Sequence, residues 1–221
     1  MNESVKIMIQ RFVFNPVQVN CYVLSDDESG QAVVVDCGAT SAEEMEPLMQ
    51  YLRDHRLTPV RLLNTHAHFD HVWGNAFFHE ATGLCPEMSA DDYDLYQHLS
   101  DQVRMIMGLN LQLSTCPVGE PLTPEREITF GKYRIQVIPT PGHTPGGVSL
   151  YIPDWEPEPV VLTGDTLFRA SVGRTDLPGG DSQALLKSLH KLLELPDNVK
   201  AYPGHGPATT IGYERQHNPY A

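Results

Sequence analysis

The sequence has no run of apolar residues that approaches the ~20 needed to cross a bilayer as a helix. Its N-terminal segment, MNESVKIMIQRFVF, also lacks the basic start, apolar centre and small-residue cleavage site of a secretory signal. These two absences predict a cytoplasmic protein that has no membrane partner.

Positive charge is scarce as well. The 221 residues include 15 Lys and Arg against 28 Asp and Glu, a formal net charge of −13. Because an acidic surface repels phosphate backbones and anionic lipids, we do not expect nucleic acid or a membrane surface as a partner. The four cysteines form no Cys-x-x-Cys pair, which argues against a zinc knuckle or thioredoxin motif and favours reduced thiols.

The chain also shows no short repeat, low-complexity tract or evident linker. Hydrophobic residues make up 41% of it, enough for a substantial core. Apolar, β-branched segments alternate with segments of helical period, which predicts a single α/β domain over 1–221 with sheets inside and helices outside. The strands are expected at 20–25, 31–38, 60–64, 127–130, 133–140, 147–152, 159–164 and 199–204.

Helices are expected between and after these strands. The first carries a candidate capping box, in which Ser41 and Glu44 satisfy backbone groups at its start. The segment 109–125 holds three prolines and no clear period, so we expect a loop there. The predicted helices are 41–56, 72–83, 89–108, 182–195 and 209–218.

Metal-binding side chains crowd into one short stretch, Thr65 to His71, which reads THAHFDH. It holds His66, His68, Asp70 and His71 directly after a predicted strand. A strand alternates its faces and cannot point three such imidazoles at one place, whereas a tight loop that enters a helix can. Imidazoles together with a carboxylate suit zinc, iron or manganese.

Three further stretches repeat one pattern, in which a ligand-type side chain and glycine follow a strand. TPGHTPGG places His143, LTGDTLF places Asp165, and YPGHGP places His205 after apolar segments. Loops at strand ends are where α/β proteins build their sites. Seven candidate ligands exceed what one ordinary zinc takes, so the count favours two metal ions.

These motifs, in this order, resemble the metallo-β-lactamase-fold hydrolases, and within them the hydroxyacylglutathione hydrolase (glyoxalase II) branch. The likeness runs from NCYVL and VVVDCGA, through THAHFDH, TPGHTPG, GDTLF and YPGHG, to TTIGYERQHNP. It implies a four-layer αβ/βα fold with two mixed β-sheets between helices. It also implies two divalent metal ions, with zinc as the first expectation and iron or manganese as alternatives.

The resemblance also assigns the ligands and the reaction. It implies a first metal on His66, His68 and His143, a second on Asp70, His71 and His205, and a bridging Asp165. A hydroxide held between the ions would attack the carbonyl of a small-molecule thioester, most naturally a hydroxyacylglutathione. Catalysis would then depend on Asp165 as the bridge and on Asp70, which also orients the hydroxide or takes its proton.

Departures from the family pattern bear on substrate recognition. The chain has sixteen residues after His205 and no C-terminal helical domain of the kind that holds glutathione, and Pro207 stands where the longer enzymes usually have tyrosine. Arg174 resembles in position a glutathione-contacting lysine, so a clamp on a substrate carboxylate is one reading. The other is an ion pair with Asp176 that only shapes the loop.

Other functions on the same fold are also open. A persulfide dioxygenase would use a single iron on His66, His143 and Asp165, and it shares the GRTD stretch, although LPGGD follows here as in the short hydrolases. A true lactamase is disfavoured because many have cysteine at the position of Asp165. RNA-processing relatives carry extra domains that are not visible here, and a non-catalytic binding module would not need all seven ligands.

Several other residues have structural interpretations. Asp36, at the end of a strand, is expected to support the site from behind its ligands. Five histidines on or beside helical segments are expected not to bind metal: His55, His79, His98, His190 and His217. Tyr93, Tyr96 and Met105 to Met107 are expected in the core or in a pocket wall.

Overall fold

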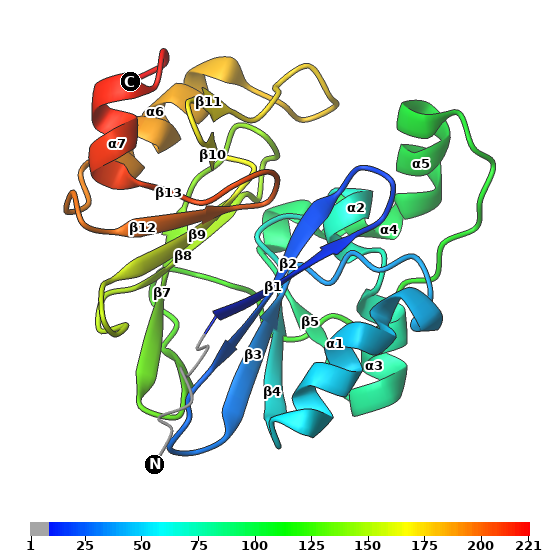
Figure 1. The fold of residues 1–221 in the computed structure, drawn as a ribbon. Coiled ribbons are helices and arrows are strands. Elements are labelled where there is room, and N and C mark those ends of the chain that lie inside the picture. Colours follow the sequence, from blue (N-terminus) through cyan, green and yellow to red (C-terminus); the bar gives the residue numbers. More distant parts are fainter. Residues whose placement is uncertain (1–8) are drawn as a thin grey trace.

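The computed structural model describes residues 9–221, and its architecture is two facing β-sheets with helices outside them (Figure 1). Residues 1–8, which begin the segment assessed for a secretory signal, lie outside the described residues. Within residues 9–221, no helix is both long and apolar enough to cross a membrane.

The first sheet has five strands in the order β1-β2-β3-β4-β5. Its first two pairings are antiparallel and the last two are parallel, so the sheet is mixed, as expected. The strands are β1 (Ile9–Phe14), β2 (Val19–Ser25), β3 (Gln31–Val35), β4 (Thr58–Leu63) and β5 (Pro86–Glu87).

The second sheet has six strands in the order β13-β12-β9-β8-β7-β6 and is also mixed, because β12 and β9 alone run parallel. Its strands are β6 (Ile128–Phe130), β7 (Tyr133–Pro139), β8 (Val148–Ile152), β9 (Val160–Gly164), β12 (Lys200–Pro203) and β13 (Thr209–Thr210). A separate hairpin pairs β10 (Leu167–Phe168) with β11 (Ser171–Val172).

Helices cover the outer face of each sheet. The helices are α1 (Ala42–Asp54), α2 (Phe69–Val72), α3 (Asn75–Thr82), η1 (Ala90–Asp92), α4 (Tyr93–Gln97), α5 (Leu99–Met107), α6 (Ser182–Leu193) and α7 (Ile211–His217). In Figure 1, α1 and α3 lie beside the first sheet, and α6 and α7 lie beyond the second.

Three buried clusters account for the four layers. Strand alternation sends Tyr22 and Leu24 into a cluster between the sheets, and sends Cys21 and Val23 of the same strand into a cluster under α1 and α3. Val161 of β9 joins a third cluster beneath α6 and α7. Each sheet therefore buries both faces, which confirms the four-layer α/β architecture.

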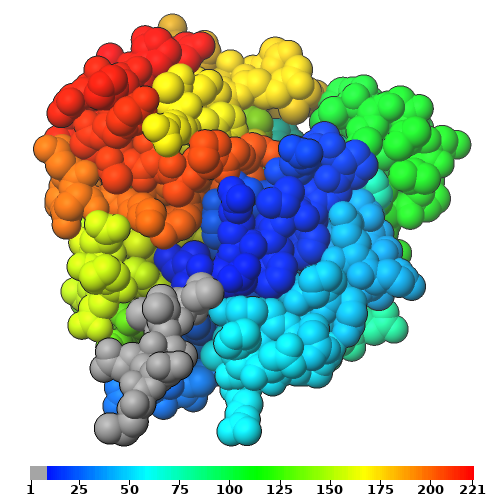
Figure 2. Space-filling view, in the orientation of Figure 1, coloured from blue at the N-terminus to red at the C-terminus, as the bar shows by residue number. Residues whose placement is uncertain are grey.

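The two halves also touch at one edge of the molecule, beside the start of β2 and the end of β12. There the backbone N–H of Asn20 in β2 donates to the carbonyl of Gly204, which follows β12, at 2.7 Å. Figure 2 shows the blue surface of the β1–β2 segment against the orange surface of the β12 region. This edge carries the loops discussed below.

The structure refines several local expectations. The Ser41 hydroxyl accepts the Glu44 N–H, as a capping box requires, but the Glu44 carboxylate binds the N–H groups of Thr40 and Asn15 instead of that of Ser41. The predicted helix 89–108 is three short helices, and 72–83 begins its continuous helix only after Gly74. Segment 199–204 is not the last strand, because Thr209–Thr210 pairs with it.

Candidate metal centre

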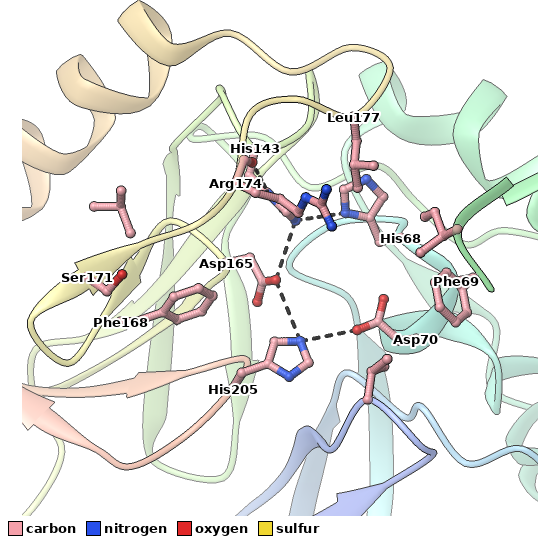
Figure 3. A pocket seen from close by; sticks show the side chains of 13 residues that line it. His68, Phe69, Asp70, His143, Asp165, Phe168, Ser171, Arg174, Leu177 and His205 are labelled. Atoms are coloured by element: carbon pink, nitrogen blue, oxygen red, sulfur yellow. Dashed lines mark hydrogen bonds and ion pairs between the residues drawn. The ribbon is translucent and has the colours of Figure 1, made fainter. Parts of the chain in front are cut away.

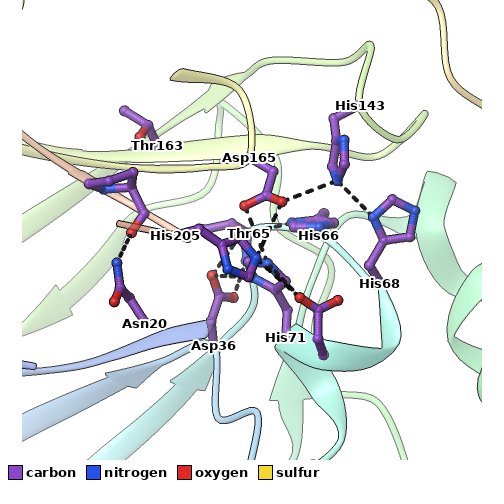
Figure 4. A network of polar contacts seen from close by, with 12 residues as sticks. Asn20, Asp36, Thr65, His66, His68, His71, His143, Thr163, Asp165 and His205 are labelled. Atoms are coloured by element: carbon purple, nitrogen blue, oxygen red, sulfur yellow. Dashed lines mark hydrogen bonds and ion pairs between the residues drawn. The ribbon is translucent and has the colours of Figure 1, made fainter. Parts of the chain in front are cut away.

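All seven candidate ligands lie at one edge of the sheets, in loops that follow strands or at the start of a helix. Those of the first half follow β4: two in the loop after Leu63 and two in the short helix α2. Those of the second half follow three different strands, β7, β9 and β12. The structure brings together His66, His68, Asp70, His71, His143, Asp165 and His205 (Figure 4).

One group joins three imidazoles. Ligand atoms of His66, His68 and His143 lie within 4.8 Å of one another, and all three residues are buried. Nδ1 of His68 lies 2.8 Å from Nε2 of His143. The rings of His66 and His143 are nearly perpendicular, with centroids 4.8 Å apart. Three imidazole nitrogens that face one another in this way make a set of donors for one cation.

A second group joins a carboxylate to two imidazoles. Nε2 of His205 lies 3.1 Å from Oδ2 of Asp70, and Nε2 of His71 lies 3.7 Å from the same oxygen. Asp165 stands between the two groups. Its Oδ1 lies 3.3 Å from Nε2 of His71, while its Oδ2 lies 3.4 Å from Nε2 of His143. Oδ1 therefore faces the second group, while Oδ2 faces the first group and also lies 3.6 Å from Nε2 of His205.

The donor set fits metal ions. Nε2 of His66, Nε2 of His71 and Oδ1 of Asp165 are buried and have no hydrogen-bond partner in the described part of the chain. The 3.3 Å approach of His71 to Asp165 lacks hydrogen-bond geometry. Because a buried polar atom without a partner costs free energy, atoms of this kind that converge on one point indicate a site for cations.

Asp36 orients two of the imidazoles from behind. Its Oδ2 accepts a hydrogen bond from Nδ1 of His71 at 3.0 Å and another from the Thr65 hydroxyl at 2.7 Å. The Thr65 hydroxyl in turn lies 3.1 Å from Nδ1 of His66. Nδ1 of each ring is thus engaged, which leaves Nε2 to face the centre. The supporting role expected for Asp36 agrees with these contacts.

Backbone carbonyls orient two more rings. Nδ1 of His143 donates to the carbonyl of Arg174 at 2.6 Å, and Nδ1 of His205 donates to the carbonyl of Gln18 at 3.3 Å. A carbonyl can only accept, so each Nδ1 bears a proton, and the lone pair of each ring lies on Nε2 once that nitrogen is deprotonated. A metal ligand needs that lone pair.

Two rings of the first group, His66 and His68, are held in the neutral form. Burial lowers the pKa of His68 to about 3, and the neighbouring His143 acts in the same direction. Burial, followed by the charge on His71, also holds the pKa of His66 well below its ordinary value. These rings therefore have their lone pairs available for a metal ion at neutral pH.

The second group is charged. Burial by itself would lower the pKa of His71, but the carboxylates of Asp165, Asp36 and Asp70 outweigh it and raise that pKa well above the ordinary value. Burial opposes charge on Asp165 too, yet His71 holds its pKa well below the usual range. The pKa of His205 is raised, because its hydrogen bond to Asp70 outweighs burial. Protons on His71 and His205 thus balance the negative charge of the carboxylates that a metal cation would otherwise balance.

Asp92 ties together the loops that carry the first group. Its Oδ2 accepts the Ala67 N–H at 3.0 Å and the Thr144 hydroxyl at 2.8 Å, and its Oδ1 accepts the Gly146 N–H at 2.7 Å. The residue is fully buried. Sequence reasoning missed it, because nothing in SADDYD distinguishes Asp92 from its exposed neighbour Asp91.

Other buried amides secure the loop 66–71. Gln102 of α5 accepts the Phe69 N–H at 3.0 Å and donates to the Ala67 carbonyl at 3.1 Å. Asn15 donates to the Asp70 carbonyl at 2.9 Å. These side chains were also not predicted, since their partners are backbone groups far away in the chain.

Gly204 shows why glycine precedes a ligand. A Cβ at this position would lie 2.3 Å from Oδ1 of Asp165 and 2.5 Å from Cε1 of His71, which no real side chain tolerates. The glycine therefore lets the backbone of one ligand loop pass against two other ligands.

Arg174 makes one of the two contacts weighed from sequence, the ion pair with Asp176. Its Nε and Nη2 bind the two carboxylate oxygens of Asp176, each at 2.7 Å, and both side chains are exposed. Arg174 also lines a pocket of about 410 Å³ that opens onto the centre (Figure 3). Its guanidinium is therefore paired with Asp176 while it remains beside the pocket.

The remaining expectations are resolved individually. His55, His98 and His217 each bond through Nδ1 to the carbonyl four residues earlier in their helices, away from the centre. Tyr96 is fully buried in the core, whereas Met105 is 56% exposed. Cys21 and Cys37 are buried as expected, whereas Cys85 and Cys116 are only half-buried.

Comparison with known proteins adds independent findings. The sequence profile of the Metallo-beta-lactamase superfamily matches residues 14–205. The probable metallo-hydrolase YqgX of Bacillus subtilis is 34% identical and covers 96% of each chain. The crystal structure of BLEG-1 B3 metallo-beta-lactamase superposes with a TM-score of 0.86 at 36% identity, covering 96% of this chain and 99% of that one. That of TTHA1623 in a di-iron-bound form gives 0.83 at 39%, covering 96% and 100%.

Two more distant relatives bear on the alternative reactions. Glyoxylase B2 of Dictyostelium discoideum is 30% identical, over 83% of this chain and 64% of its own length. The crystal structure of ETHE1 from Myxococcus xanthus has a TM-score of 0.76 at 26% identity, covering 96% of this chain and 84% of that one.

Proposed function

The chain belongs to the metallo-beta-lactamase superfamily, and on that premise we propose that this metal-dependent hydrolase holds two metal ions and cleaves thioesters, with hydroxyacylglutathiones as its substrates. One observation carries the proposal: seven ligand-type side chains from both halves form two groups that share the carboxylate of Asp165. These groups form the floor of a pocket of about 410 Å³, a size suited to a small substrate.

In this proposal the two groups are the two metal sites. Asp165 joins them, with Oδ1 toward the second group and Oδ2 toward both. The first ion would be held by His66, His68 and His143, and the second by Asp70, His71 and His205. Because all seven ligands are imidazole or carboxylate, zinc, iron and manganese all suit the donor set, and zinc is our first expectation.

The bound ions would supply a nucleophile at neutral pH, since a metal lowers the pKa of water from ~15.7 to ~7, and would polarise the substrate carbonyl. The remaining work falls to the protein. Asp70 lines the pocket, so its carboxylate is placed to orient the attacking water and take its proton. The carbonyls of Arg174 and Gln18 hold the rings of His143 and His205 so that Nε2 of each ring stays directed at the metal centre.

Two relatives support this reaction class. YqgX is named a probable metallo-hydrolase, and Glyoxylase B2 carries the name of the glyoxalase system. The di-iron form of TTHA1623 supports a site for two ions on this fold and keeps iron among the candidates. The lactamase name of BLEG-1 makes β-lactams a necessary comparison substrate.

The test combines elemental analysis with a thioester assay. Protein produced in metal-replete medium should contain close to two metal ions per chain and should hydrolyse S-D-lactoylglutathione. A penicillin and a cephalosporin, assayed with the same preparation, should be poorer substrates. Two metal ions per chain with β-lactam cleavage but no thioester cleavage would overturn the proposed substrate, while the assignment as a dinuclear hydrolase would stand.

The alternative is a persulfide dioxygenase, for which the fold similarity to ETHE1 is the supporting observation. It would use one iron on His66, His143 and Asp165. Oxygen consumption with glutathione persulfide, one iron per chain at saturation and no thioester cleavage would favour it over the hydrolase.

A further inference from the structure

The pocket above the candidate metal centre has a polar floor and apolar walls (Figure 3). Its floor is made by His68, Asp70, His143, Asp165 and His205, which all belong to the centre. Ser171, Arg174 and six apolar side chains line the remainder, and the apolar ones are Val17, Phe69, Ile106, Phe168, Val172 and Leu177. A substrate that places its reacting carbonyl on this floor must therefore set its neighbouring atoms against hydrocarbon.

The walls come from four separate segments, one of which is α2 with Phe69. Val17 lies in the turn between β1 and β2, Ile106 lies near the end of α5, and Leu177 follows the β10–β11 hairpin. Val17 is 40% exposed, and Ile106 and Leu177 are partly exposed. Apolar side chains left open to water around a reactive centre gain free energy when a ligand covers them.

The charges around the pocket indicate which part of a glutathione thioester can fill it. Among the described residues that line it, Arg174 is the one charged side chain outside the centre, and Asp176 occupies its guanidinium. Ser171 is the one hydroxyl. The walls therefore offer little to the charged groups of glutathione, which keep their water or bind at the mouth, because burying an unpaired charge is costly. The acyl group is the part of a glutathione thioester that can fill an apolar pocket.

We propose that the apolar walls select the acyl group, so that the preferred substrates are 2-hydroxyacyl thioesters whose acyl body is a longer alkyl or an aryl group, with Ile106 as a specificity-determining residue. This inference rests on the proposed thioesterase function. It names the chemical class of the acyl group and places the boundary of the acyl site on α5.

The size of the effect follows from hydrophobic transfer. Fully burying one methylene changes a binding constant by about fourfold, and a partly open wall recovers less of this. The kcat/KM should therefore rise by roughly twofold to fourfold for each methylene added to the acyl chain until the pocket is full. A small, hydroxylated lactoyl group covers little of the wall and should be among the poorer substrates.

The first experiment varies the acyl body and keeps the hydroxyl and the glutathione constant. The purified holoenzyme is assayed with the S-lactoyl, S-2-hydroxybutanoyl, S-2-hydroxyhexanoyl and S-mandeloyl thioesters of glutathione. We expect kcat/KM to increase along the alkyl series and to be high for mandeloyl. A flat or falling series, with lactoylglutathione hydrolysed well, would overturn this inference while supporting the proposed function.

A matched pair of variants on α5 locates the selecting wall. Ile106→Ala removes a pocket-lining side chain, whereas Met105→Ala removes a neighbour that is 56% exposed and is not part of the lining. Alanine suits a helix, so α5 should persist in both variants, and the Tm of Ile106→Ala measures what is lost from its packing against the buried cluster of Tyr96 and Leu99. We expect the hydroxyhexanoyl-to-lactoyl ratio of kcat/KM to fall threefold to tenfold in Ile106→Ala and to stay at the wild-type value in Met105→Ala. Equal ratios in all three proteins would remove Ile106 from the acyl site.

Binding of thioethers tests the walls without any hydrolysis. S-methyl-, S-butyl- and S-hexylglutathione cannot be cleaved, and calorimetry on the metal-loaded protein measures their Kd. Affinity that rises with alkyl length, and rises less in Ile106→Ala, supports the apolar site whether or not any thioester is cleaved. A lack of thioester cleavage would count against the proposed function alone. Affinity independent of alkyl length would overturn the apolar site itself.

Discussion

The two halves of the molecule supply their ligands in different ways. The first half provides four candidate ligands from six consecutive positions, His66 to His71, in one loop and the helix α2 that follows it. The second half provides His143, Asp165 and His205 from the ends of three different strands. The first set is local in sequence, whereas the second exists only once the second sheet has formed.

The support behind these ligands differs in the same way. Buried side chains hold the first set, among them Asp36, Asp92 and Gln102. Backbone carbonyls hold the rings of His143 and His205. The orientation of the first set can therefore be changed one side chain at a time, while that of the second depends on the path of the loops. The predictions that follow exploit this difference.

The largest effect is expected for Asp165→Asn, because Asp165 faces ligands of both halves. Asparagine keeps the size of the side chain but removes the charge that would neutralise two cations. We expect loss of at least one metal ion and a fall in kcat of roughly a hundredfold or more, since even residues behind the ligands are worth ~10–100-fold. Elemental analysis and a thioester assay measure both quantities. The control is Asp154→Asn, an exposed turn residue; full activity with two metals in Asp165→Asn would refute the bridge.

The next effect is expected for Asp92→Asn. Asp92 accepts three hydrogen bonds that join the loop of the first half to the loop of His143. An amide would present a donor to one of those donors, so the two loops should separate slightly. We expect the first site to lose ~10–100-fold in metal affinity and the second to change little.

Competition with a chelator, followed in two steps, distinguishes a local effect from a general one. Asp91→Asn, at the exposed neighbouring position, should leave both steps unchanged. If Asp92→Asn weakened both sites equally, or only lowered the Tm, Asp92 would be a general structural residue instead of a positioning residue for the first site.

A smaller contrast is expected in pH dependence. The raised pKa values of His71 and His205 mean that a metal entering the second site must displace protons, so its affinity should fall as pH falls. His66 and His68 have lowered pKa values and are neutral already, so the first site should respond less. In metal titrations between about pH 6 and about pH 8, the affinity of the second site should change by up to about tenfold per pH unit for each displaced proton, and that of the first site should change less. Identical slopes for both sites would contradict this assignment.

The smallest effect is expected at the rim, where Arg174 is paired with Asp176. Arg174→Lys keeps the charge but loses the fork, so KM for a glutathione thioester should rise several-fold if Arg174 binds a substrate carboxylate. Asp176→Asn frees the guanidinium and should lower the same KM. Metal content and Tm should stay near wild type in both variants, because an exposed ion pair contributes ~0–1 kcal/mol.

A comparison substrate sharpens the test of Arg174. A thioester of a thiol without carboxylates should show the same KM in all three proteins. If the ratio of the two KM values did not change in either variant, the clamp would be excluded and the pair would serve only to shape the loop.

Much of the fold could be predicted from sequence, and what could not has a common cause. The strands β2, β3, β7, β8 and β9 were predicted because their own apolar, β-branched residues specify them. The strands β1, β5, β10, β11 and β13 were missed. Four of these have two residues each, and a pair of residues is a strand only because a partner lies beside it.

The sequence by itself determined which residue types stand after each strand. The spacing of THAHFDH already placed four ligand-type side chains within six consecutive positions. Tertiary structure alone decided that Asp165 turns one oxygen toward His71 and the other toward His143, and that Asp92, not Asp91, joins two loops. It alone also assembled the apolar walls from four segments. The physical reason is distance along the chain: local spacing can bring neighbours onto one loop, but contacts between residues many tens of positions apart exist only after both sheets have packed.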